Sequence, residues 1–401
     1  MTPPLEAARL AWRRLLPARA RAALRGPAGM VVRNAVVATS KATPRAIADG
    51  PVIVSGFLGE GFGIGRAGRY TLAALERRGY RPRAHDLRPL LTHGSMGSER
   101  LAPGEPGGTW IVHCNPPEAV VAFSRIRRAD YLGRYRIGYW AYELPRAPES
   151  WRRLAVLFDE IWVPSTFVRD ALRLPAGRVR VMPHPVEDVA PARPRGDGCT
   201  IGAVGDFKSS VDRKNLEGAV RIFTRAFPEP DGQARLVVKT LGFDPQAAPG
   251  VAAALGRRAD IELVDARLSD AEMAALLSGL DILLSPHRAE GFGLVLLETM
   301  ARGIPALATG WSGNMDFMAA LPELLIDYDL VRVADRAGIY PAGRASLWAE
   351  PDIADGAAKL RRLVGERETR ARLSRAVRAV APQMASAWDR QDLFTHARPT
   401  G

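Results

Sequence analysis

The chain has 401 residues, of which 47% are hydrophobic and 25% are charged, and its formal net charge is +13. This balance is typical of globular proteins and excludes wholesale disorder and collagen-like repeats, while the length predicts two domains. No stretch approaches the ~18 uninterrupted apolar residues that a membrane-spanning helix requires. Two cysteines cannot form a disulfide framework, and no secretory hydrophobic segment follows Met1, so we expect a cytoplasmic protein.

The excess positive charge is concentrated near the N-terminus. Residues 1–50 carry nine basic and two acidic side chains, a net +7 out of the total of +13. We therefore treat residues 1–48 as a basic N-terminal extension, in which segment 5–16 has apolar residues near helical spacing. Two interpretations stay open, an amphipathic helix on an anionic membrane surface and a solvated arm. Nucleic acid is not expected as a partner, because no RNA-binding signature accompanies the arginines.

Residues 49–190 alternate between predicted strands and helices. Short apolar runs predict strands at 51–55, 81–87, 109–113, 135–140 and 160–163. Helices are predicted at 66–78 and 151–158, and a glycine-rich loop at 56–65. This alternation predicts a parallel sheet covered by helices on both faces, which would be an N-terminal Rossmann-like domain.

A second alternating series follows a segment rich in proline, glycine and charge at 187–198, which indicates a linker. Its predicted strands are 199–204, 234–240, 261–264, 281–285 and 305–309. Its predicted helices are 215–227, 269–278 and 294–302, and the tail is helical over 353–383 and 385–394. We assign 191–380 to a C-terminal Rossmann-like domain and 381–401 to a helical tail that packs back on the first domain. The fold class is thus α/β, with two doubly wound domains facing an interdomain cleft.

Segment 285–305 has the pattern of a ligand site. A strand ends at Ser285, a loop carries Glu290, and Gly291 and Gly293 open a helix. The glycines allow a ligand to approach the backbone, and the helix start offers free N–H groups to a diphosphate. Glu298 lies about one and a half turns into that helix, where a carboxylate can accept hydrogen bonds from two neighbouring hydroxyls. This arrangement predicts a nucleotide-sugar site.

The same segment resembles the E-x7-E signature of glycosyltransferase family 4, which comprises retaining enzymes with the two-domain GT-B fold. Glu290 and Glu298 have the signature spacing. Other stretches that agree in order are 206–215, 300–305, 140–145, 160–165 and 311–317. The last three look like a bacterial subgroup linked to surface-polysaccharide assembly. The resemblance covers about residues 50–380 and does not extend to residues 1–48.

The resemblance implies roles for particular residues. Glu290 would hold hydroxyls of the donor sugar and Glu298 those of the ribose, while fixed cations would neutralise the departing diphosphate. The implied cations are Lys208, Arg213 and Lys214. The donor would also contact Gly291, Phe292, Gly293, Leu294, Gly63, Gly65 and Arg66. His113 would lie near the reacting carbon, and Glu143 and Asn115 would contact the acceptor.

The expected activity is transfer of a hexose from a nucleoside-diphosphate sugar to a hydroxyl of a glycan or lipid-linked acceptor, in surface-polysaccharide or lipopolysaccharide synthesis. The nucleotide sugar is a substrate, and neither a cofactor nor a metal is expected. The enzyme would be cytoplasmic, with possible attachment to the inner face of the plasma membrane through residues 1–48. The sequence does not specify the base, the sugar or the acceptor.

Alternative functions stay open at this point. Gly63, Gly65 and Gly68 match the G-x-G-x-x-G dinucleotide fingerprint, and Asp86 follows eighteen residues later, so an NAD(P)-dependent oxidoreductase is one alternative. Against it, Gly63 lies eight residues past Ser55, whereas the fingerprint belongs directly at the strand end. A non-catalytic sugar-nucleotide-binding protein is another alternative. Segment 327–329 has the D-x-D pattern, which we interpret as a surface turn.

Overall fold

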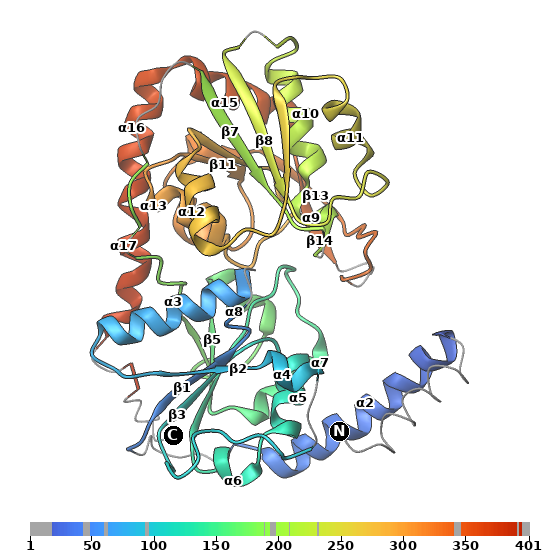
Figure 1. Ribbon diagram of the computed structural model, residues 1–401, viewed down its shortest axis with the longest axis vertical. Helices are drawn as coiled ribbons and strands as arrows, with labels where there is room; N and C mark the ends of the chain where they lie inside the picture. The colour runs from blue at the N-terminus through green and yellow to red at the C-terminus, as the bar shows by residue number, and fades with distance from the viewer. Residues whose placement is uncertain are drawn as a thin grey trace.

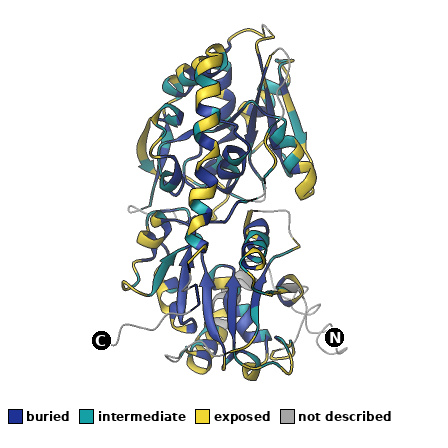
Figure 2. Cartoon of the chain, turned by 90° about the vertical axis from the view of Figure 1, so that its left-hand side faces the viewer, coloured by how far each residue is buried: buried dark blue, intermediate teal, exposed yellow. Residues whose placement is uncertain are grey.

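The computed structural model describes residues 18–42, 49–59, 63–92, 96–187, 189–192, 198–207, 209–230, 232–340, 346–390 and 393–394. Two six-stranded sheets form two domains stacked along the long axis of the molecule (Figure 1). The central strands of each sheet are mostly buried, whereas the outward faces of the surrounding helices are exposed (Figure 2).

The first sheet is parallel throughout and has the strand order β2-β1-β3-β4-β5-β6. Its strands are β1 Val52–Gly56, β2 Arg83–Asp86, β3 Thr109–His113, β4 Tyr135–Tyr139, β5 Glu160–Val163 and β6 Val179–Val181. The helices of this domain are α3 Gly63–Arg77, α4 Arg88–Thr92, α5 Pro116–Arg125, α6 Arg128–Tyr131, α7 Glu149–Leu154, η1 Ala155–Leu157 and α8 Thr166–Leu172. Every residue of β3 and β4 is buried, as expected for parallel strands covered on both faces.

The second sheet is also parallel, with the order β12-β11-β10-β7-β8-β9. Its strands are β7 Cys199–Val204, β8 Ala234–Thr240, β9 Ile261–Asp265, β10 Ile282–Ser285, β11 Ala306–Thr309 and β12 Leu325–Ile326. Counted from β7, this is the order 3-2-1-4-5-6 of a dinucleotide-binding Rossmann sheet.

The helices of the second domain alternate with these strands. They are α9 Val211–Lys214, α10 Leu216–Ala226, α11 Pro249–Leu255, α12 Asp270–Ser278, α13 Leu294–Ala301, α14 Met315–Met318, η2 Pro322–Leu324, α15 Ile353–Gly365 and α16 Arg367–Arg378. Local sequence fixes some of their starts. Ser269 and Glu272, for example, form a capping box at the start of α12, which satisfies backbone N–H groups that the helix leaves free.

A small antiparallel pair, β13 Tyr328–Arg332 and β14 Leu347–Pro351, lies outside both large sheets. This pair was not expected from the sequence. The expected turn at 327–329 is in fact the start of this pair, and Asp329 is exposed on β13.

The end of the chain returns to the first domain through α17 Val380–Ala385 and η3 Ser386–Trp388. The Trp388 ring is fully buried, lies 5.6 Å from the Trp162 ring on β5, and donates its indole N–H to the Pro183 carbonyl at 2.7 Å. The chain therefore connects the two domains twice.

Helix α2, Ala18–Ser40, projects from the first domain and was not predicted at this position (Figure 1). Its C-terminal end is fastened to the domain. Val36 is buried, the Ser40 hydroxyl lies 2.7 Å from the Tyr131 hydroxyl, and the Arg136 guanidinium donates to the Ser40 carbonyl at 2.6 Å. The amphipathic segment predicted at 5–16 lies outside the described residues.

Candidate functional site

The carboxyl ends of strands from both sheets meet at one cavity of about 470 Å³ between the domains. In the second sheet the strand order reverses between β7 and β10, and in the first between β1 and β3. Open parallel sheets bind ligands at such switch points, because neighbouring loops there diverge to opposite faces. Residues after β7, β10 and β3 line the cavity.

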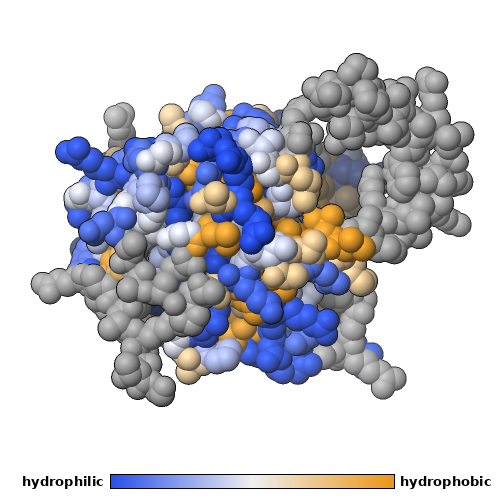
Figure 3. Space-filling model, turned by 90° about the horizontal axis from the view of Figure 1, so that it is seen from below, coloured by the Kyte–Doolittle hydropathy of each residue, from blue (hydrophilic) through white to orange (hydrophobic). Residues whose placement is uncertain are grey.

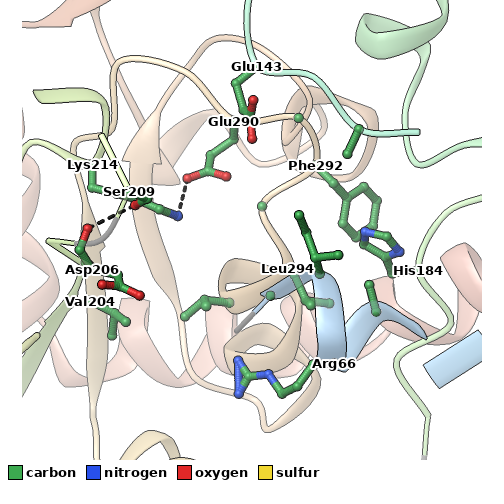
Figure 4. A pocket seen from close by; sticks show the side chains of 18 of the residues that line it. Arg66, Glu143, His184, Val204, Asp206, Ser209, Lys214, Glu290, Phe292 and Leu294 are labelled. Atoms are coloured by element: carbon green, nitrogen blue, oxygen red, sulfur yellow. Dashed lines mark hydrogen bonds and ion pairs between the residues drawn. The ribbon is translucent and has the colours of Figure 1, made fainter. Parts of the chain in front are cut away.

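Glu290 is buried in the cavity wall between two cations. The Lys214 ammonium lies 2.6 Å from Glu290 Oε1, and the Arg213 guanidinium lies 3.0 Å from the same oxygen. Figure 4 shows the Lys214 and Glu290 side chains pointing toward each other. Burial by itself would raise the pKa of Glu290, but Lys214 and Arg213 outweigh it and lower the pKa to about 2. The carboxylate is therefore ionised at neutral pH.

The loop after Glu290 packs closely against the backbone of other segments. A Cβ at Gly313 would collide with the Gly291 carbonyl, and Gly293 has φ +93°, so both positions favour glycine. The Ser165 hydroxyl of the first domain donates to the Gly291 carbonyl at 2.6 Å. These contacts hold Glu290 at the domain boundary.

Helix α13 begins directly after this loop. Gly293 occupies its N-cap position without a side-chain hydrogen bond from the described residues, and Gly291, Phe292, Gly293 and Leu294 all line the cavity. The first N–H groups of a helix have no partner within the helix and carry partial positive charge. This helix start can therefore bind an anion beside Lys214.

Glu298 is placed differently from the expectation. It does not line the cavity: it is 2% exposed, and it binds Arg66 at 2.8 Å and Tyr70 at 3.0 Å, both on α3 of the first domain. Burial raises the pKa of Glu298, and the neighbouring Arg66 acts in the opposite direction. In this conformation, Arg66 and Tyr70 of the first domain hydrogen-bond to the carboxylate that we expected to bind the ribose.

The first domain contributes neutral imidazoles to the cavity. His113 ends β3, is 3% exposed, and stacks on Tyr139 with ring centroids 4.1 Å apart. Its Nε2 has no hydrogen-bond partner among the described residues, and burial lowers its pKa to about 3. His184 also lines the cavity, and its Nδ1 lies 3.0 Å from the Tyr139 hydroxyl.

The two predicted acceptor residues also line the cavity. Asn115 Oδ1 accepts a hydrogen bond from the Ala141 N–H at 3.0 Å, which orders the loop after β4. Glu143 is half-buried and accepts a hydrogen bond from the Tyr340 hydroxyl at 2.9 Å.

Of the other predicted donor residues, Gly63 and Arg66 line the cavity, whereas Gly65 is buried in α3 and Lys208 lies outside the described residues. The sequence analysis missed Lys239, whose ammonium donates to the Ala266 carbonyl at 2.6 Å at the cavity wall. A usable signal existed, because Lys239 lies at a predicted strand end and is one of only five lysines.

The dinucleotide fingerprint does not form the expected turn. Gly63, Gly65 and Gly68 all lie within α3, after a loop that begins beyond Gly56. Asp86 does end β2, but the Arg88 guanidinium binds it at 2.8 Å. The oxidoreductase alternative therefore loses the tight strand-to-helix turn on which it depends.

Within the described ranges, no three His, Cys, Asp or Glu side chains come together as a set that could hold a metal ion. In the same part of the chain, every helix is too short or too polar to cross a bilayer.

Comparison with known proteins identifies both the fold and a family signature. Residues 198–336 match the family model described as Glycosyl transferases group 1. Sucrose-phosphate synthase from Thermosynechococcus elongatus is similar in structure, with 16% identity and a TM-score of 0.59 over 85% of this chain and 98% of that one. HepE from Anabaena, solved with UDP and glucose, has 14% identity and a TM-score of 0.56 over 86% and 98%.

TarM from S. aureus, solved with UDP and alpha-GlcNAc-glycerol, has 13% identity and a TM-score of 0.51, over 72% of this chain; the match spans only 55% of TarM. No curated protein sequence matches the chain. The predicted GT-B fold, with two Rossmann-like domains, is thus confirmed, and residues 198–336 resemble group 1 glycosyltransferases. The assignment to family 4 stays a prediction.

Buried neutral His113 predicts a pH-dependent stability. Since its pKa falls from 6.5 to about 3 on folding, the unfolded chain binds the extra proton between these values. Stability is therefore present above pH 6.5 and is lost as the pH falls, at up to ~1.4 kcal/mol per pH unit for this residue. Urea unfolding across this range should give a steeper loss for the parent than for His113→Gln.

Near pH ~8 the imidazole is neutral in both states, so the difference between parent and variant there reports packing alone. Parallel pH profiles below 6.5 would contradict the assignment of His113 as a buried neutral base.

Proposed function

We propose that the chain is a retaining glycosyltransferase of the family 4 type, which transfers a hexose from a nucleoside-diphosphate sugar to a hydroxyl of a glycan or lipid-linked acceptor. The observation that carries the proposal is the buried, ionised Glu290 beside Lys214 and the start of α13, at the switch point of the second sheet. The structurally similar HepE and TarM were solved with UDP.

A role in surface-polysaccharide or lipopolysaccharide synthesis rests on two supports. One is the resemblance of segments 140–145, 160–165 and 311–317 to a bacterial polysaccharide subgroup. The other is the similarity to WaaG, described as a glycosyltransferase involved in lipopolysaccharide biosynthesis, at 13% identity and a TM-score of 0.50 over 86% of this chain and 96% of that one.

Glu290 would orient the donor sugar. Both cations contact its Oε1, and no described residue hydrogen-bonds to Oε2. A carboxylate oxygen can accept two hydrogen bonds, so Oε2 can bind sugar hydroxyls while Oε1 stays paired. The negative charge at Glu290 also keeps Lys214 and Arg213 beside the place where the diphosphate would depart.

The cations are placed where negative charge would grow on the leaving diphosphate in the transition state. The bond between the anomeric carbon and the phosphate oxygen breaks, and negative charge grows on the diphosphate. Lys214, Arg213 and the N–H groups at the start of α13 would stabilise that charge, because they are fixed in place before the reaction. These groups supply positive charge without a metal ion, which is why we propose a metal-independent, cofactor-free reaction.

Retention follows if the acceptor attacks on the face from which the diphosphate leaves. In this front-face displacement the departing phosphate oxygen takes the proton of the acceptor hydroxyl, and the new bond forms at the anomeric carbon without a protein nucleophile. Neutral His113 would donate or accept one hydrogen bond near the reacting carbon through its unpaired Nε2. Glu143 and Asn115 would contact the acceptor from the first domain.

The ribose role of Glu298 requires a conformational step. Arg66 and Tyr70 must leave the carboxylate before ribose hydroxyls can bind it. Separation of α3 from α13 as the domains open would achieve this and would free Arg66 for the diphosphate. Lid and domain motions of this kind commonly control substrate entry in transferases.

Membrane attachment is a further part of the proposal. Helix α2 exposes Met30, Val31 and Val32 next to Arg33, and the 48-residue N-terminal segment is strongly basic. Figure 3 shows the molecule from its first-domain end, where hydrophobic residues lie among hydrophilic ones. Apolar side chains flanked by arginines suit the headgroup region of an anionic bilayer. We therefore propose peripheral binding at the cytoplasmic face of the membrane.

The catalytic proposal is tested by turnover. A thermal-shift screen with UDP, GDP, dTDP, ADP and NADH first identifies the nucleotide, since a ligand of the folded state raises its melting temperature. Release of that nucleoside diphosphate from its sugars is then measured. Glu290→Gln should lower kcat by about 10²–10³, because the sugar loses a charged anchor. The exposed Glu229→Gln is the matched control.

Near-parental turnover by Glu290→Gln would remove this residue from the site. Stabilisation by NADH alone would favour the oxidoreductase alternative. Nucleotide binding by the parent without release of diphosphate, with any donor sugar or acceptor tested, would favour a non-catalytic binding protein.

The membrane proposal is tested by sedimentation with anionic vesicles. Val31→Asp should reduce the bound fraction about tenfold, because a charge would enter the apolar part of the contact. The control is Leu330→Asp, since Leu330 is 51% exposed on β13 of the other domain. Equal binding of both variants and the parent would exclude α2 as the attachment site.

A further inference from the structure

The β13–β14 pair, together with residues 333–340, forms a segment that we name the strap. It lies beside α9 at the edge of the second domain that faces the first (Figure 1). Neither six-stranded sheet includes it. Its contacts converge on the backbone that carries the two cations of the site.

Two neighbouring residues of the strap bind α9 and the serine that caps it. The Arg336 guanidinium donates from Nε to Asp212 Oδ1 at 2.8 Å, and its backbone N–H donates to Asp212 Oδ2 at 2.7 Å. Asp335 Oδ1 accepts a hydrogen bond from the Ser210 hydroxyl at 2.7 Å. Ser210 and Asp212 are both buried, and Ser210 also caps α9.

Arg288 links the other end of the strap to the same turn. Its guanidinium binds Glu350 of β14 at 2.5 and 3.0 Å and donates to the Asp212 carbonyl at 2.6 Å. The Arg288 backbone N–H donates to the Arg213 carbonyl at 2.7 Å. The peptide groups on either side of Arg213 are therefore held from outside α9.

External support matters here because α9 is a single turn of four residues, Val211–Lys214, which ends at Asn215 with φ +54°. One turn of helix is not stable by itself, since nucleation fixes several dihedral angles for few hydrogen bonds. The directions of the Arg213 and Lys214 side chains therefore depend on the contacts that hold the turn.

The strap also contacts the first domain beside the cavity, at Glu143 of its wall. The Tyr340 hydroxyl donates to Glu143 at 2.9 Å, and the Tyr340 ring lies 6.2 Å from the Tyr142 ring. One segment thus contacts both the cation turn of the second domain and the acceptor side of the first.

We infer that the strap positions the diphosphate-binding cations, with Arg336 as the principal positioning residue, acting through Asp212 on Arg213 and Lys214. This inference rests on the proposed function. Arg336 itself is not among the residues that line the cavity, so its effect is transmitted through α9. Its loss should misplace the cations while leaving the core of the domain intact.

The test uses binding of inorganic pyrophosphate, measured by calorimetry, and the turnover of the active donor. Arg336→Ala should weaken pyrophosphate binding and lower kcat at least about tenfold, equivalent to ~1.4 kcal/mol. Arg336→Lys, which keeps the charge, should recover part of the loss. Arg332→Ala is the control, because Arg332 is exposed on β13 and no contact of its side chain is described.

A double-mutant cycle separates positioning from general destabilisation. If Arg336 acts through Lys214, then Arg336→Ala should add little to the loss caused by Lys214→Met. Fully additive losses, or an Arg336→Ala variant that matches Arg332→Ala, would overturn the inference. Absence of sugar transfer by the parent would instead contradict the proposed function, and pyrophosphate binding would then decide the positioning role.

Discussion

The ion cluster of buried Glu290 and Arg213 with half-buried Lys214 is the interaction on which the site depends. A carboxylate buried alone would take up a proton, and two cations buried alone would repel each other. Together they stay charged: both cations contact one carboxylate oxygen at 2.6 and 3.0 Å. The cluster joins the turn after β7 to the loop after β10. The order of the strands in the second sheet reverses between β7 and β10.

The same cluster is coupled to the position of the two domains. The Gly291 carbonyl next to it accepts a hydrogen bond from Ser165 of the first domain. Glu298, on the helix α13 that follows this loop, is bound by Arg66 of the first domain. Glu143 of the first domain is bound by Tyr340 of the strap. In the described conformation, these contacts between the domains are therefore made by Glu298 and Glu143, which we expect to bind the donor and the acceptor. Under the proposed function, these side chains would link substrate entry to domain motion.

Local sequence was sufficient for part of this account. The Glu290 loop could be predicted because strand, glycines and helix follow one another within twenty residues, and Arg213 and Lys214 precede a recognisable helix. The doubly wound fold could be predicted because buried parallel strands are continuous apolar runs.

The remainder depends on contacts between distant segments. Arg66 and Glu298 are separated by 232 positions, and nothing near either residue indicates the pairing. The strap could not be predicted for a different reason. Short exposed strands such as β13 have no alternation of buried and exposed residues that the sequence would reveal. Helix α2 was missed because its partners, Tyr131 and Arg136, lie about a hundred residues away.

A structure of the chain with the nucleoside diphosphate selected by the thermal-shift screen would show directly whether the ion cluster and the start of α13 bind the diphosphate. We expect diphosphate oxygens within about 3 Å of the Lys214 ammonium and of the first N–H groups of α13, with Glu290 still paired. We also expect that the ribose replaces Arg66 at Glu298. A nucleotide bound elsewhere, or a diphosphate that contacts neither Lys214 nor α13, would contradict this expectation.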